Sequence, residues 1–216
     1  MPDKPEPAPT PVPVITAAQL QGALRGRLVQ VQPLCAEHEN GLSQAAAGDP
    51  DMFAWMPVDM ASSREALRDW LSRSLAAAAE GREVPFAIVD ATSGAVLGST
   101  RFLELRLEHL RAEIGWTWLT RSAWSTGANV ETKLLLLERA FEHAGLRRVE
   151  FKTDARNARS RGALEALGAT FEGIMRKHMV VRDGGERDSA YYSVVDDDWP
   201  RIKAHLRNRL ERRTDR

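Results

Sequence analysis

One segment, from Ile114 to Phe141, constrains the fold of this chain more than any other. Its first part, "IGWTWL", has the composition of a β-strand, and its last part, "LLLLERAF", has the apolar character of a helix. Small polar residues around a single glycine, Gly127, join the two over Thr120 to Lys133, "TRSAWSTGANVETK". A strand that passes through a short loop into a helix begins a crossover connection, so this segment predicts a mixed α/β fold.

The segments on either side extend this pattern to a whole domain. Strands are predicted at residues 27–34, 85–91, 96–105, 112–119, 148–154, 171–181 and 189–195. Helices are predicted at residues 36–48, 62–78, 130–144, 157–169 and 199–210. Six of the eleven prolines fall within the first 13 residues, so residues 1–14 are expected to form an extended, flexible tail. The rest, residues 15–216, is expected to be one domain, because 43% apolar content supports a sizeable core.

Composition narrows the class of protein. Thirty basic and thirty acidic residues give no net charge, which makes a nucleic-acid partner unlikely on overall electrostatics. A single cysteine, Cys35, excludes an intramolecular disulfide and fits a reducing compartment. No apolar run reaches about 18 residues and the first residues are too polar for a signal peptide, so a cytoplasmic protein without a membrane partner is predicted. The five histidines have no ligand spacing, so no metal is expected.

The join before the long helix has the features of an anion site. The first amides of a helix have no partner within it, and the helix dipole adds partial positive charge there. Gly127 and Ala128 would let phosphate oxygens approach these amides, while Thr126, Asn129 and Arg121 could add donors or charge. The alternative is that a polar residue of the loop merely caps the helix. Neither a Walker loop nor a dinucleotide fingerprint is present.

The order of the motifs along the chain is more specific than any one of them. They are "EIG" at 113–115, "WSTGAN" at 124–129, "NARS" at 157–160 and "LG" at 167–168. From about Leu28 to Trp199 the chain resembles the GNAT superfamily of acetyl-CoA-dependent N-acetyltransferases, and within it the branch of the ribosomal-protein N-terminal acetyltransferases. It departs from that branch at Ser125, which replaces a frequent glycine, and at Asn129, where a smaller residue is usual. The resemblance implies a mixed, mostly antiparallel sheet of about seven strands, splayed around an acetyl-CoA cleft and flanked by helices.

The resemblance also implies roles for individual residues. Glu113 would be the general base, acting through water, although a surface glutamate at a strand end is the alternative. Ser160 is the candidate acid for the leaving thiolate, although it could equally be an ordinary residue at a helix start capped by Asn157. Tyr191 and Tyr192, on opposite faces of one strand, are the reserve acids. The residues implied in binding acetyl-CoA are Trp118, Leu119, Thr120, Trp124, Ser125, Thr126, Gly127, Ala128, Asn129, Asn157 and Ser160.

The amine acceptor is the part that the sequence determines least. Phe53, Trp55 and Met56 place aromatic and apolar bulk in a loop, where they could line an acceptor pocket or pin the loop to the core. A protein N-terminal amine, such as that of a ribosomal protein, is the acceptor that the resemblance favours. A small amine such as an antibiotic or polyamine is the alternative, as are a non-catalytic acyl-CoA-binding module and an RNA-binding protein using the basic segment 201–216. The oligomeric state, including a homodimer, stays open.

Overall fold

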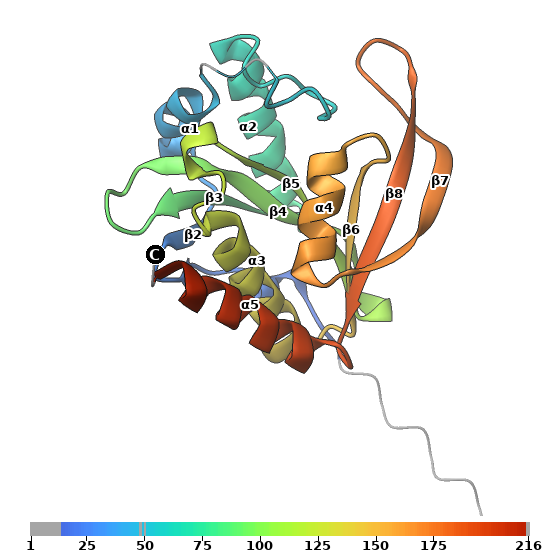
Figure 1. Ribbon diagram of the computed structural model, residues 1–216. Coiled ribbons are helices and arrows are strands. Elements are labelled where there is room, and N and C mark those ends of the chain that lie inside the picture. The colour runs from blue at the N-terminus through green and yellow to red at the C-terminus, as the bar shows by residue number, and fades with distance from the viewer. Residues whose placement is uncertain (1–13, 48, 50, 215–216) are drawn as a thin grey trace, which may run out of the picture.

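The computed structural model describes residues 14–47, 49 and 51–214, and its centre is one eight-stranded sheet in the order β1-β2-β3-β4-β5-β6-β8-β7 (Figure 1). The strands are β1 (Leu24–Arg25), β2 (Val29–Pro33), β3 (Val84–Asp90), β4 (Val96–Arg106), β5 (Arg111–Leu119), β6 (Arg148–Asp154), β7 (Thr170–Val180) and β8 (Glu186–Val195). The helices are α1 (Glu39–Ala46), α2 (Arg64–Ala79), α3 (Ala128–Glu138), α4 (Ala158–Leu167) and α5 (Trp199–Thr214).

The mixed α/β class and the predicted element order are confirmed, with one correction to the strand count. The sheet has eight strands, because β1, which is two residues long, pairs antiparallel with β2 at the edge. So short a strand has no alternation that a sequence pattern could reveal. Most of the tail predicted at residues 1–14 lies outside the described residues. In the described part of the chain, no helix is both long and apolar enough to span a membrane.

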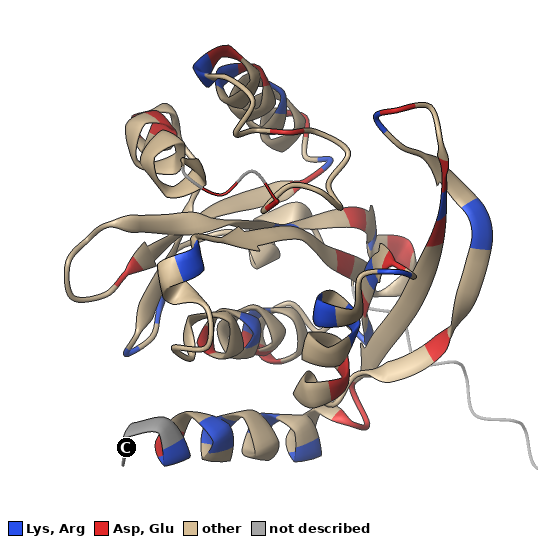
Figure 2. Cartoon of the chain, turned by 45° about the horizontal axis from the view of Figure 1, so that its top comes forward, with Lys and Arg blue, Asp and Glu red and all other residues tan. Residues whose placement is uncertain are grey.

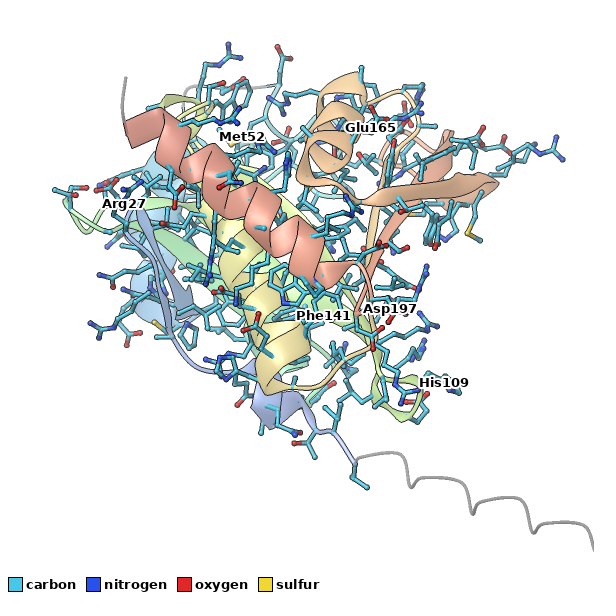
Figure 3. The ribbon with its side chains drawn as sticks, turned by 60° about the horizontal axis from the view of Figure 1, so that its bottom comes forward. Arg27, Met52, His109, Phe141, Glu165 and Asp197 are labelled. Carbon is cyan, nitrogen blue, oxygen red and sulfur yellow. The ribbon has the colours of Figure 1, made fainter. Side chains whose placement is uncertain are left out.

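Helices cover both faces of the sheet. Figures 1 and 2 show α1 and α2 on one face and α3 with α5 on the other, while α4 lies over β6. Each face buries its own apolar cluster: Phe53, Trp70 and Trp118 belong to the α1–α2 side, and Leu136, Phe151 and Tyr192 to the α3–α5 side. Figure 3 shows α5 lying across α3. The two faces therefore offer separate approaches to the middle of the sheet.

A buried carboxylate fixes α3 against the sheet. Glu131 accepts hydrogen bonds from three consecutive backbone amides, those of Arg27 (2.9 Å), Leu28 (2.6 Å) and Val29 (2.8 Å). A Cβ atom at Gly26 would lie 2.3 Å from a Glu131 carboxylate oxygen, so only glycine fits there. This contact joins the start of β2 to the first turn of α3, and so sets where that helix begins.

We expect Glu131→Ala to lower the free energy of unfolding by about 3 kcal/mol, because three amides would lose a charged acceptor at once. Glu138→Ala is the matched control on the same helix. Glu138 pairs with Lys203 and Arg207 near the surface, and its loss should cost less than about 1 kcal/mol. Denaturant unfolding of both variants measures the difference, and equal losses would show that the Glu131 contact adds nothing special.

Candidate functional site

The sheet divides in its middle. β5 and β6 pair in parallel at only three positions, ending at Glu113 opposite Glu150. Beyond that pair β6 stays with β8 as far as Asp154, and β5 stays with β4 as far as Leu119. Backbone groups of β5 and β6 that face each other beyond Glu113 are therefore left for another partner, because buried amides and carbonyls need one.

A bulge in β5 lies beside this opening. The register with β4 shifts between Ser99 opposite Trp118 and Arg101 opposite Gly115, and Trp116 has a left-handed φ of 51°. A bulge places backbone groups outside the regular ladder and is a common feature of functional sites. The guanidinium of Arg101 lies 4.8 Å from the centre of the Trp116 ring and so supports the bulge.

The loop after β5 turns through two left-handed residues before α3 begins. Ser125 and Gly127 have φ values of 61° and 106°, and Gly127 caps α3. The Thr126 hydroxyl donates to Ala123 O at 2.8 Å and accepts from Ala128 N at 3.2 Å, so Thr126 shapes the turn. The first backbone-to-backbone hydrogen bond of the helix runs from Glu131 N to Gly127 O at 2.9 Å. The earlier amides of the turn have no partner within the helix and point out of its start.

Two arginines bring positive charge to this loop. The Trp124 indole donates to Leu119 O at 2.8 Å, which fixes the ring. The guanidinium of Arg159 lies 3.8 Å from the ring centroid and that of Arg121 lies 4.9 Å from it. Arg121 also pairs with Asp49 at 3.0 Å. Arg159 comes from α4 and was not among the residues that the sequence indicated, because its nearness to Trp124 exists only in the fold.

Glu113 stands where the two strands separate. It is buried, with 3% of its surface exposed, and its carboxylate lies 2.9 Å from Lys152 Nζ on β6. Burial raises the pKa of the Glu113 carboxyl, and the charge of Lys152 opposes that rise. A carboxyl with a raised pKa is suited to taking up a proton near neutral pH. The structure thus gives Glu113 a buried position beside the opening rather than a place on the surface.

The candidate acids have different surroundings. Asn157 caps α4 by accepting the Ser160 amide at 3.0 Å, as the alternative interpretation of these residues predicts, and Ser160 is partly exposed. The buried Tyr192 hydroxyl donates to Glu165 Oε1 at 2.9 Å and accepts from Arg161 at 3.1 Å, both on α4. Tyr191, on the other face of β8, bonds His178 at 3.2 Å. Roles for these residues stay predictions.

A pocket of about 440 Å³ opens on the α1–α2 side of the sheet. It lies among the loop after α1, the end of β6 and the β7–β8 hairpin, and its walls are Ala54, Trp55, Met56, Asp154, Arg156, Val181, Arg182 and Asp183. Trp55 is 37% exposed and stacks on Arg156, whereas Phe53 is fully buried against Trp118. Trp55 and Met56 therefore line the pocket, and Phe53 lies in the core behind it.

The pocket and Glu113 share one face of the sheet. Arg182 joins the hairpin to the loop, donating to Phe53 O and pairing with Asp59, both at 3.1 Å. Beneath the pocket, the buried guanidinium of Arg187 interacts electrostatically with both Asp154 and Glu113. Hydrogen bonds from the Arg156 side chain and amide, with the charge of its guanidinium, hold the pKa of Asp154 below its usual range. Arg187 thus links the charge of Asp154, in the pocket wall, to that of Glu113, the candidate base.

Comparison with known proteins gives the family. The acetyltransferase (GNAT) domain matches residues 29–170. The chain belongs to the GNAT acetyltransferase family. It is 31% identical to a GCN5-related N-acetyltransferase from Brucella melitensis, whose structure superposes with a TM-score of 0.82 over 88% of this chain and 85% of that one. Identity to the N-acetyltransferase p20 of Bacillus licheniformis is 28% over 130 residues, 60% of this chain and 72% of the relative.

A further solved structure shares this GNAT fold. It is Mycobacterium smegmatis RimJ in complex with CoA-disulfide, 23% identical, with a TM-score of 0.70 over 86% of this chain and 91% of that one. The resemblance to the GNAT superfamily inferred from the motifs is confirmed, and so is the enzyme class, an N-acetyltransferase. The GNAT fold uses acetyl-CoA, which makes the divided sheet and the loop before α3 the parts of this chain to consider for binding it.

Proposed function

We propose that this GNAT enzyme transfers the acetyl group of acetyl-CoA to the N-terminal amine of a protein, such as a ribosomal protein. The observation that carries the proposal is the arrangement of two sites on opposite sides of one opening in the sheet. An anion-binding turn lies before α3, and a pocket of about 440 Å³ lies above β6. Glu113 stands between them, where β5 leaves β6.

The loop and the opening fit acetyl-CoA. Gly127, in the left-handed region and without a side chain, lets an anion approach the first amides of α3, and Arg121 and Arg159 add positive charge beside it. The backbone groups of β5 beyond Glu113 are available to a polar, extended arm, and donors at the Trp116 bulge could polarise a carbonyl. When bound, acetyl-CoA supplies an acetyl group activated as a thioester.

Glu113 and the pocket would act on the acceptor. An ammonium has no lone pair, so the acceptor amine must lose a proton before it can attack. Glu113 would take this proton, directly or through water, because burial raises the pKa of its carboxyl and so makes it a stronger base. The pocket would hold the amine near the opening, and this orientation lowers the barrier further.

The charge of the pocket favours a peptide over a polycation. Its wall has two carboxylates, Asp154 and Asp183, and two guanidiniums, Arg156 and Arg182, beside the apolar surfaces of Trp55 and its neighbours. A polyamine or aminoglycoside would need an excess of negative charge, which this wall lacks. A peptide main chain needs both donors and acceptors, and the paired charges provide them.

An acetylation assay tests the proposal. We expect release of CoA with short peptides that have a free N-terminus, and none with the same peptides blocked at the N-terminus. Trp55→Ala should raise KM for the peptide several-fold with a smaller change in kcat, because the residue lines the proposed acceptor pocket and not the opening where the chemistry would occur. Faster turnover of spermidine or an aminoglycoside than of every peptide would reject the protein acceptor and support the small-amine alternative.

A further inference from the structure

Lys133 is a buried lysine in the opening between β5 and β6. It extends from α3, and its Nζ atom donates to the Thr117 hydroxyl of β5 at 2.6 Å. The same atom lies 5.6 Å from the centre of the Phe151 ring on β6. Both neighbours follow the last β5–β6 pair, so the amine bridges the place where the strands have separated.

Nothing in the fold explains a charge at this point. Only 6% of Lys133 is exposed, and within residues 14–47, 49 and 51–214 no carboxylate forms an ion pair with it. Glu113, the carboxylate on the adjacent part of β5, is paired instead with Lys152 at 2.9 Å. A buried cation without a counter-ion destabilises the folded state, and a leucine or methionine would pack more favourably. Such a residue is typical of a functional site.

The protonation of Lys133 suits proton transfer. Burial lowers the pKa of the Lys133 amine to about 7, and the negative charge of Glu113 opposes that decrease. The hydroxyl of Thr117, held in turn 2.8 Å from that of Thr100, gives the amine a fixed direction. At neutral pH the group therefore exists in both forms and can give up a proton readily.

We propose that Lys133 is the catalytic acid, donating a proton from Nζ to the leaving sulfur of CoA. This inference rests on the proposed function. The acceptor nitrogen bonds to the acetyl carbon as the carbon–sulfur bond breaks, and the electron pair of that bond stays on sulfur. The acceptor ammonium first loses one proton through Glu113 to solvent. Its nitrogen gives a second proton to Glu113 as the amide forms, and Lys133 gives one to sulfur, so the amide and the CoA thiol are both released neutral. Lys133 then regains a proton from solvent and Glu113 returns one.

This assignment accounts for the missing counter-ion. A negative charge develops on the CoA sulfur only during the reaction, and at that step it would be the counter-charge of the Lys133 ammonium. The candidate acids from the sequence have other bonds. The Tyr192 hydroxyl is held by Glu165 and Arg161, and Ser160 lies in the first turn of a capped helix. Lys133 is the acid whose side chain already reaches the opening.

Titration of bound CoA tests the inference without any turnover. An ammonium beside the thiol should lower the thiol pKa of bound CoA by about one unit or more in the wild type, and not in Lys133→Met. The thiol pKa of bound CoA is measured from thiolate absorbance as a function of pH, with the protein saturated with CoA. The absorbance of CoA-free protein is subtracted to remove the contribution of the Cys35 thiolate. Lys203→Met is the matched control, because that lysine of α5 pairs with Glu138 at the end of α3 and with Glu142 just after it.

Activity and stability give a second readout. Lys133→Met should lower kcat about 100-fold and remove the fall in rate above neutral pH, with the affinity for acetyl-CoA nearly unchanged. Because the folded-state pKa of Lys133 lies below the unfolded value, the wild type loses stability as pH falls from about 10.5 to 7. The variant should therefore melt at or above the wild-type temperature at pH 7, with the advantage shrinking toward pH 10.

Three results would overturn the assignment. The first is a thiol pKa of bound CoA that is the same in the wild type and in Lys133→Met. The second is a Lys133→Met protein that melts at a lower temperature than the wild type and no longer binds acetyl-CoA. The third is acetylation of Lys133 detected by mass spectrometry, which would make the residue a nucleophile. Failure of the peptide acceptor is distinguishable from these. A lowered thiol pKa in the wild type alone would support Lys133 even if no peptide were acetylated.

Discussion

Replacing Gly127 with glutamate is expected to abolish the thermal stabilisation of the protein by acetyl-CoA. Gly127 caps α3 with a φ of 106°, where the first amides of the helix meet the loop. At 100 times its dissociation constant, a ligand stabilises a protein by about 2.7 kcal/mol, or roughly 5–10 °C in a domain of this size. A carboxylate at this point would repel the phosphates and cover the amides, so an affinity loss of about 1,000-fold or more is expected.

Gly81→Glu separates this effect from backbone strain. Gly81 also has a left-handed φ, 69°, and a Cβ atom there would meet nothing within 4 Å. Both variants place a side chain in the left-handed region, at a cost of about 1–2 kcal/mol, but Gly81 lies after α2 and away from the loop. Differential scanning fluorimetry with and without acetyl-CoA should give a wild-type shift for Gly81→Glu. A full shift in Gly127→Glu would mean that acetyl-CoA does not use this turn.

Local patterns were enough to predict most of the fold. β6 has the bounds predicted for it, residues 148–154, and α4 begins after its predicted cap, Asn157. Such elements can be predicted because their signals, strand alternation, helix caps and terminal glycines, lie within a few residues of one another in the sequence. The first strand and the bulge at Trp116 were missed, because a two-residue strand has no period and an extra residue in a strand does not alter its composition.

The buried polar groups could not be predicted in the same way. Glu131 and Lys133 both follow the loop and were not singled out by the sequence pattern, but α3 is buried on several sides, and each of the two meets a different strand. Phe53 is an apolar example: it lies in a loop and was a candidate for the acceptor pocket, but its side chain packs on Trp118 in the core. Contacts over such long separations depend on the assembled sheet, so only their residue types were visible beforehand.

The basic C-terminal helix illustrates the same limit. Its sequence left open a surface for RNA, but in the fold Lys203 pairs with Glu138 and Glu142, and Arg207 pairs with Glu138. Arg209 donates to the Ala166 carbonyl at the end of α4. These cations help hold α5 on its neighbours, and charge patterning alone could not distinguish that role from a binding surface.

Glu113→Gln is expected to lower kcat/KM about 1,000-fold while leaving acetyl-CoA binding intact. The change replaces the proposed base with a group of the same shape that cannot accept a proton, and general-base catalysis contributes about 100- to 10,000-fold. Glu150→Gln is the matched control. Glu150 lies opposite Glu113 in the ladder but pairs with Arg111 and Arg148, both at 2.8 Å, so its loss should leave the rate within a few-fold. Equal losses in both variants would indicate a structural role for the two carboxylates.

The pH dependence distinguishes a base from a carboxylate that only holds Lys152. In the wild type, kcat/KM should rise with pH through the raised pKa of Glu113, because the base acts in its deprotonated form. Glu113→Gln should lose this rise. The charge of Lys152 lowers the Glu113 pKa against the effect of burial, so Lys152→Met should move the rise to higher pH. A rise that stays in place in Lys152→Met would assign it to another group and leave Glu113 only as the partner of Lys152.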